Sequence, residues 1–174
     1  TGTIPDFNLP LLEVLDVSSN SLSGELILFT GMPSLKNLKV SYNELTSINK
    51  YFGFPNLEYL DVSNNKFSGE LPSINCPKLK VLDLSNYKNY STPYKFSGTI
   101  PDDMILTSCE SFKINHNDLT GTFPLIYMPN VRHIDISFNN LSGTLPSFDG
   151  YTNLITLNAF YNKFSGNIPA FNLA

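Results

Sequence analysis

The chain has 174 residues, of which 41% are hydrophobic and 15% charged, as in folded domains of ordinary size. Its net charge of −4 argues against nucleic acid and against an anionic membrane surface as partners, since both require an excess of Lys and Arg. The sequence contains no apolar run long enough to span a bilayer, and its two cysteines are too few for a disulfide framework or a zinc site.

One pattern, LxxLxLxxNxLxGxLP, recurs seven times along the chain. A partial copy covers residues 1–11, and a single repeat cannot bury its apolar face alone, so stacking of repeats is the expected source of stability. We predict one repeat-solenoid domain over residues 1–174. We expect it to lack terminal caps and to be part of a longer chain or assembly. The repeats begin at Leu12, Leu35, Leu57, Leu79, Cys109, Val131 and Leu154.

The first half of each repeat alternates apolar and polar residues, which is the period of a short strand. Stacking such strands predicts a curved parallel β-sheet on the concave face. The inward residues Leu12, Leu15, Val17, Leu22 and Leu26, with their equivalents, should be nearly inaccessible to solvent. The strands should be centred near Leu15, Leu38, Leu60, Leu82, Phe112, Ile134 and Leu157.

The second half of each repeat carries Asn and Gly at fixed positions, followed by the convex segment. A buried Asn can bond backbone groups where strand becomes loop, and Gly fits a turn with unusual dihedral angles. Proline near both ends of the convex segment disfavours a helix, so irregular or 3₁₀ structure is expected, with one helical turn at 102–111. An inner apolar row is predicted from Phe7, Phe29, Tyr51, Ile74, Ile126, Phe148 and Phe171.

An insertion at 86–95 lengthens the fourth repeat. Its tyrosines, Tyr87, Tyr90 and Tyr94, predict a contact loop, because tyrosine supplies contact area at low entropy cost. N-glycosylation motifs occur at Asn89 and Asn140, although two such motifs are expected by chance in a chain so rich in Asn and Ser.

Outward positions of the predicted sheet suggest where a ligand binds. One column alternates acidic and basic residues in part, which relieves repulsion across a sheet. The other gathers rings in the C-terminal half, and we expect these to form one exposed patch that contacts the ligand. The alternative is that the rings only cover the loop that follows. The predicted site consists of His116, His133, Phe138, Phe160 and Tyr161, with Asp83, Lys113 and Asp135.

The sequence offers no constellation for catalysis. His116 and His133 lack the further ligands that a metal ion needs, and no nucleophile, metalloprotease or phosphate-binding motif is present. Cys76 and Cys109 are expected to be buried thiols, with a disulfide as the less favoured alternative. We therefore expect neither an enzyme nor a cofactor.

The phrases LDVSSNSLSGEL, LDVSNNKFSGELP, IDISFNNLSGTLP and FYNKFSGNIP resemble the plant-type class of leucine-rich repeats. That class includes receptor ectodomains and polygalacturonase inhibitors, and its usual repeat is two residues longer. The resemblance implies a curved solenoid at the cell surface or outside the cell that binds a protein, peptide or glycan on its concave face. The alternative is a structural repeat segment of a larger surface or matrix assembly.

Overall fold

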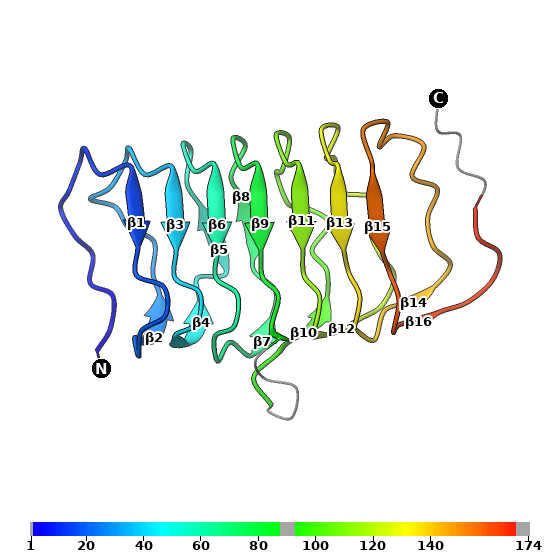
Figure 1. Cartoon of the computed structure of the whole chain (residues 1–174), viewed down its shortest axis with the longest axis horizontal. Coiled ribbons are helices and arrows are strands. Elements are labelled where there is room, and N and C mark those ends of the chain that lie inside the picture. Colours follow the sequence, from blue (N-terminus) through cyan, green and yellow to red (C-terminus); the bar gives the residue numbers. More distant parts are fainter. Residues whose placement is uncertain (1, 88–92, 170–174) are drawn as a thin grey trace.

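The computed structural model describes residues 2–87 and 93–169, and its repeats stack side by side along one axis (Figure 1). One parallel sheet of seven strands runs through the repeats in chain order. The middle residue of each strand is the predicted centre, and these centres pair in register, as Leu38 does with Leu60. The predicted solenoid is therefore confirmed. The strands are β1 (Val14–Asp16), β3 (Asn37–Lys39), β6 (Tyr59–Asp61), β9 (Val81–Asp83), β11 (Ser111–Lys113), β13 (His133–Asp135) and β15 (Thr156–Asn158).

The return half of each repeat is extended and pairs in parallel with its neighbours. The pairs are β2–β4, β5–β8, β7–β10–β12 and β14–β16. The helical turn expected at 102–111 is wrong: Ile105 bridges to Asn75 and its backbone N–H donates to the Ile74 carbonyl at 2.9 Å. Residues 2–87 and 93–169 contain no α-helix. These strands are β2 (Ser23–Leu26), β4 (Glu44–Ile48), β5 (Tyr51–Gly53), β7 (Gly69–Glu70), β8 (Ser73–Asn75), β10 (Phe96–Thr99), β12 (Asp118–Thr120), β14 (Ser142–Gly143) and β16 (Lys163–Phe164).

The core lies between the long sheet and the return segments. The middle residues of the inner strands are buried, and Leu38, Leu60 and Phe112 have no exposed surface. The prediction of near-complete burial was too broad for the first and last repeats, where residues such as Leu15 and Leu157 are only half-buried. β1 and β15 are the edge strands of the sheet, so each is covered by a neighbour on one side only.

The convex apolar row is confirmed at Phe29, Ile74, Ile126 and Phe148, all buried. It is wrong at Tyr51, which is 69% exposed, because Phe52 takes the inward place. The cause lies in the second repeat, where the pairing of β2 with β4 shifts by one residue after Gly24. A shift of one residue turns every following side chain to the opposite face. Phe171 lies outside the described residues.

A ladder of Asn side chains closes the turns after the strands, as predicted. The amide of Asn65 donates to the carbonyls of Val40, Val62 and Ser63, and its oxygen accepts the Leu45 N–H at 3.0 Å. Equivalent bonds surround Asn43, Asn117, Asn139 and Asn162. The Gly column has φ between 75° and 84°, the left-handed region in which an added Cβ is strained.

Cys76 and Cys109 are free and buried, and burial raises their thiol pKa values to about 11 and about 12. Both thiols are therefore in the unreactive neutral form at physiological pH. No helix among the described residues has the length and apolarity that crossing a membrane requires.

Candidate functional site

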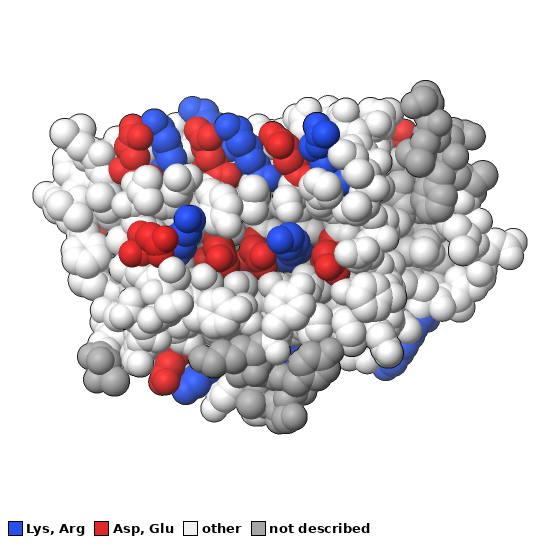
Figure 2. Space-filling model, viewed as in Figure 1, with Lys and Arg blue, Asp and Glu red and all other residues white. Residues whose placement is uncertain are grey.

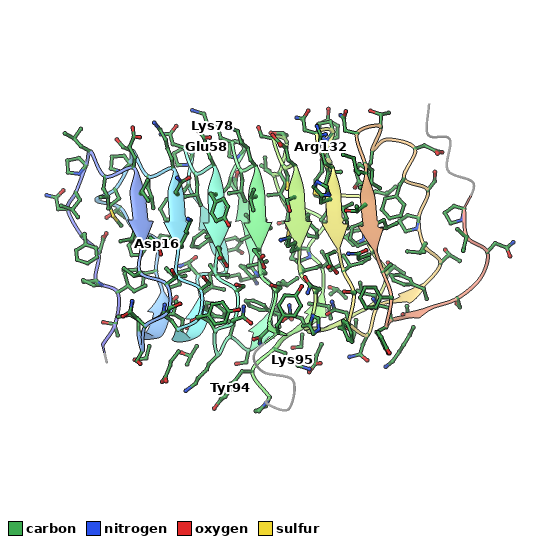
Figure 3. All side chains as sticks on the ribbon, viewed as in Figure 1. Asp16, Glu58, Lys78, Tyr94, Lys95 and Arg132 are labelled. Carbon is green, nitrogen blue, oxygen red and sulfur yellow. The ribbon has the colours of Figure 1, made fainter. Side chains whose placement is uncertain are left out.

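Two rows of charge cross the open face of the seven-stranded sheet (Figure 2). The upper row alternates without a break from Glu13 to Arg132, and Lys36 and Lys80 each lie 2.7 Å from the preceding glutamate. Figure 3 labels Glu58 and Arg132 at this edge. The row was not predicted, although it can be read from the second residue of each of the first six repeats. Its members neutralise one another, and such exposed pairs contribute little to stability because solvent screens them.

The lower row holds three predicted site residues on consecutive strands. Lys113 on β11 pairs in register with Asp83 on one side and Asp135 on the other, and its ammonium lies 3.7 Å from Asp83. Asp135 accepts hydrogen bonds from the Ser137 hydroxyl at 2.6 Å and from the Asn158 amide at 3.3 Å. The structure therefore brings the predicted charged residues together.

Asp83 differs from the other acids of this row in its surroundings. It pairs in register with Asp61 on β6, with no cation between them. Burial raises the pKa of Asp83 above its ordinary value of 3.8, against the hydrogen bonds that Ser85 donates. Asp16 has the same serine arrangement in the open, and the hydrogen bonds from Ser18 lower its pKa. The centre of the sheet thus carries an excess of negative charge.

Four rings form a continuous stack below the charge rows, which we call the aromatic stack: Tyr87, His116, Phe138 and Tyr161. Their centroids lie 4.3, 4.1 and 4.6 Å apart in that order, and Phe138 and Tyr161 are nearly parallel at 14°. Phe160 meets Phe138 edge-on at 5.1 Å. Three of the five predicted rings stack directly on one another and Phe160 joins them. Tyr87, predicted only as part of the contact loop, extends the stack.

The backbone beneath the stack is left-handed. His116, Phe138 and Tyr161 have φ of 60°, 52° and 52°. A side chain in this region costs roughly 1–2 kcal/mol, and Gly or Asn is ordinarily found there. The repeat imposes the conformation, since the N–H of Phe138 donates to the Phe160 carbonyl at 3.0 Å and other repeats are bonded alike. Bulky rings at strained positions indicate that the rings have a role of their own.

Exposure separates the members of the stack. His116 is only 8% exposed, and burial lowers the pKa of its imidazole. Tyr161 is 73% and Phe160 52% exposed, far more than a ring that merely covers a loop. The open end of the stack, at the seventh repeat, is therefore the part available to a partner.

A hollow of about 220 Å³ lies beside the stack, on the side away from the sheet, and we call it the stack hollow. Lys95 and Asp118 on its rim form an ion pair at 3.4 Å. Its lining combines ring edges with amide and charged groups: Asn86, Lys95, His116, Asn117, Asp118, Phe138, Asn139, Asn140 and Tyr161.

The remaining predicted residues lie elsewhere. His133 begins β13, where its Nδ1 lies 2.9 Å from the Thr156 hydroxyl, and no ring contact joins it to the stack within the described residues. Tyr94 lies with Lys95 at the lower edge (Figure 3), 6.0 Å from the Lys66 ammonium. Tyr90 and Asn89 are outside the described residues. No group of three metal-binding side chains occurs in 2–87 or 93–169.

Comparison with known proteins gives consistent matches. Leucine-rich-repeat family models match residues 10–67, 55–93 and 130–150. Cuscuta receptor 1 of Solanum lycopersicum and Receptor-like protein 18 of Arabidopsis thaliana are each 34% identical over 91% of the chain. The chain spans only 12% and 16% of those two proteins.

Solved structures agree in fold. The ectodomain of the Arabidopsis receptor kinase HAESA, in complex with a peptide hormone, is 30% identical with a TM-score of 0.77, over 97% of this chain and 29% of that one. The PEPR1–AtPEP1 structure is 26% identical with a TM-score of 0.71, over 97% and 28%. With the repeats, the Asn ladder and the parallel solenoid, these matches show that the chain belongs to the leucine-rich-repeat family and is similar to the plant-type class found in receptor ectodomains.

Proposed function

We propose that this chain is the recognition segment of a receptor-like protein at the cell surface or outside the cell, and that it binds a peptide or protein without catalysing a reaction. The observation that carries the proposal is the exposed end of the aromatic stack, Tyr161 with Phe160, directly after strand β15 of a rigid sheet and with Tyr161 at a strained backbone position. Rings on a rigid scaffold lose little entropy on binding and often dominate binding energy.

A peptide fits the stack better than a free glycan does. A sugar ring is held by the face of an aromatic ring, but the faces of His116 and Phe138 are turned toward their neighbours. The edges of aromatic rings are electropositive and suit the carbonyl oxygens of a peptide backbone. The peptide ligand of the HAESA ectodomain supports the same choice.

The charged row indicates what the peptide carries. The lower row has more aspartates than lysines, and Asp61 and Asp83 pair in register at its centre, so the row carries net negative charge a few strands from Phe160. A basic group on the ligand would be favoured there, with Lys113 and Asp135 fixing its orientation. The open sheet offers no cleft that would shelter a reaction from water, which favours binding without catalysis.

Selection of random peptides displayed on phage against the intact chain tests this function. We expect selected peptides to bind wild type and to lose at least tenfold in affinity with Phe160→Ser plus Tyr161→Asn. Tyr127→Ser on the convex side is the matched control, because Tyr127 is 72% exposed and Tyr161 73%. The control should bind like wild type. If selected peptides bind the stack variants as tightly as wild type, or if no peptides are selected, the alternative is favoured. That alternative is a structural repeat segment of a larger surface or matrix assembly.

A further inference from the structure

Two consecutive asparagines in the sixth repeat have opposite surroundings. Asn139 is 8% exposed, and its amide donates to the carbonyls of Ile114, Ile136 and Ser137 at 3.1–3.2 Å. Asn140 is half-buried, and its side chain makes no hydrogen bond to the described residues. Only its backbone is engaged, through the N–H that donates to the Leu119 carbonyl at 2.7 Å. The Asn140 amide is therefore available for chemistry that Asn139 cannot undergo.

The position of Asn140 in the repeat faces solvent. The equivalent residues of the other repeats are polar and exposed or half-exposed, so a large group attached here would leave the core intact. Asn140 also begins the motif Asn-Leu-Ser, completed by Ser142 on β14. This motif is the acceptor for N-glycosylation in secreted proteins. The equivalent residues are Ser21, Glu44, Lys66, Lys95, Asp118 and Lys163.

Asn140 lines the stack hollow together with His116, Phe138 and Tyr161. A group attached to its amide nitrogen therefore starts at the wall of a space of about 220 Å³. The Lys95–Asp118 pair on the rim offers a donor and an acceptor for hydroxyl and acetamide groups. Covalent attachment makes weak contacts sufficient, since it replaces binding from solution by an intramolecular encounter.

We propose that Asn140 carries an N-linked glycan and that its first N-acetylglucosamine lies in the stack hollow. In the transfer, the Asn140 amide nitrogen forms a bond to C1 of the sugar and loses one proton. The C1–oxygen bond to a lipid-linked pyrophosphate donor breaks, and the lipid pyrophosphate leaves. The proposal rests on the extracellular or cell-surface location proposed above.

The glycan has a consequence for ligand access. Asn140 lies on the side of the stack away from the sheet, whereas Phe160 follows β15 on the sheet side. A sugar in the hollow covers the lower edges of Phe138 and His116. It leaves Phe160 and the acidic row open, so the ligand approaches from the sheet.

Secretion of the whole chain from eukaryotic cells tests the modification. Peptide mass mapping before and after enzymatic glycan removal should find sugar on Asn140 and none there in Ser142→Ala. An unmodified Asn140 in the secreted chain would overturn the proposal. Mapping needs no ligand, so this result leaves the peptide-binding proposal untouched, and a failure of peptide binding leaves the glycan result untouched.

A second measurement tests the place of the sugar. With the glycan trimmed to one N-acetylglucosamine, wild type should melt about 2 °C above the Asn140→Gln variant. Lys66→Asn in the Asn140→Gln background is the matched control. It creates the same motif at the same position of the third repeat, because Ser68 lies two residues on, and residue 66 does not line the stack hollow. One N-acetylglucosamine on residue 66 should not change Tm. The reference is the same control variant with Ser68→Ala added, which removes the motif and therefore the sugar. Equal shifts at both sites, or none at Asn140, would show that the sugar does not lie in the hollow.

Discussion

The first three repeats and the last three place different side chains on one backbone conformation. Ser19, Tyr42 and Asn64 in the first set have φ of 54–56°, and their counterparts in the last set have 52–60°. No ring stack is found around Tyr42 within the described residues, whereas His116, Phe138 and Tyr161 form a continuous one. The repeat therefore fixes the backbone conformation at this position. The side chain differs between the two sets, according to the role of the surface there. Stacking compensates part of the strain in the second set.

The fourth repeat marks the border between the two sets. Tyr87 stands where the other repeats have the ladder Asn, and it forms the first ring of the stack. The stack thus begins inside the insertion at 86–95. The aromatic stack is thus confined to the C-terminal half of the solenoid, whereas charge pairs occur in both halves.

The largest expected effect tests whether the two halves of the solenoid depend equally on their buried core side chains. Leu60→Ala and Phe112→Ala each remove a fully buried inward side chain, one from each half. Each should lower the free energy of unfolding by about 2–5 kcal/mol through the cavity it leaves. Denaturant unfolding monitored by circular dichroism measures both. A small loss for one variant only would mean that the halves are not built alike.

The Asn ladder is expected to have the next largest effect. Asn139→Ala leaves the Leu119 N–H and several carbonyls without their partner and should cost about 1–3 kcal/mol. Asn140→Ala, one residue on, should change the unfolding free energy of the unglycosylated chain by less than about 0.5 kcal/mol. Comparable losses in thermal melts of both variants would contradict the distinction between these two asparagines.

Asparagine substitutions at the left-handed position sharpen the comparison between the halves. Tyr42→Asn relieves strain and loses no ring contact, so it should stabilise the chain by about 0.5 kcal/mol. Phe138→Asn also relieves strain but breaks the contacts with His116, Phe160 and Tyr161, so it should destabilise by about 1–2 kcal/mol. Melting temperatures that move in the same direction would show that the stack contributes nothing to stability.

The smallest expected effect comes from two aspartates of one row. Burial raises the folded-state pKa of Asp83, so its contribution to stability is present at acidic pH and is lost as pH rises through that pKa. Asp83→Asn should therefore stabilise the chain at about pH 7 by less than about 1 kcal/mol, with no gain at about pH 3.

Asp16 should behave in the opposite way. The hydrogen bonds from Ser18 lower its pKa, so its contribution is present at neutral pH and is lost as pH falls through the folded-state pKa. Asp16→Asn should lower Tm at about pH 7. Thermal melts of both variants across this pH range measure the contrast, and a stabilising Asp16→Asn would contradict it.

The sequence by itself determined the repeating backbone structure of the solenoid. The strand centres, the buried Asn ladder and the glycine turns follow from a period that each repeat restates, and burial of an apolar face forces those periods into one register. Asp83, Lys113 and Asp135 were predictable as neighbours for the same reason. Their equivalent places in consecutive repeats must lie side by side in a parallel sheet.

Some side-chain contacts do not follow the repeating pattern, and only the tertiary structure decided which residues make them. Tyr87 enters the stack because it lies in the insertion at 86–95. His133 stays apart because it begins its strand while Phe138 follows the strand's end. Phe52 replaces Tyr51 in the core because the strand pairing slips by one residue near Ser47. Asn140 differs from Asn139 only through the carbonyls that surround one amide and not the other. Ring contacts, register slips and amide partners depend on where neighbouring repeats place their atoms, and a repeating pattern does not encode that.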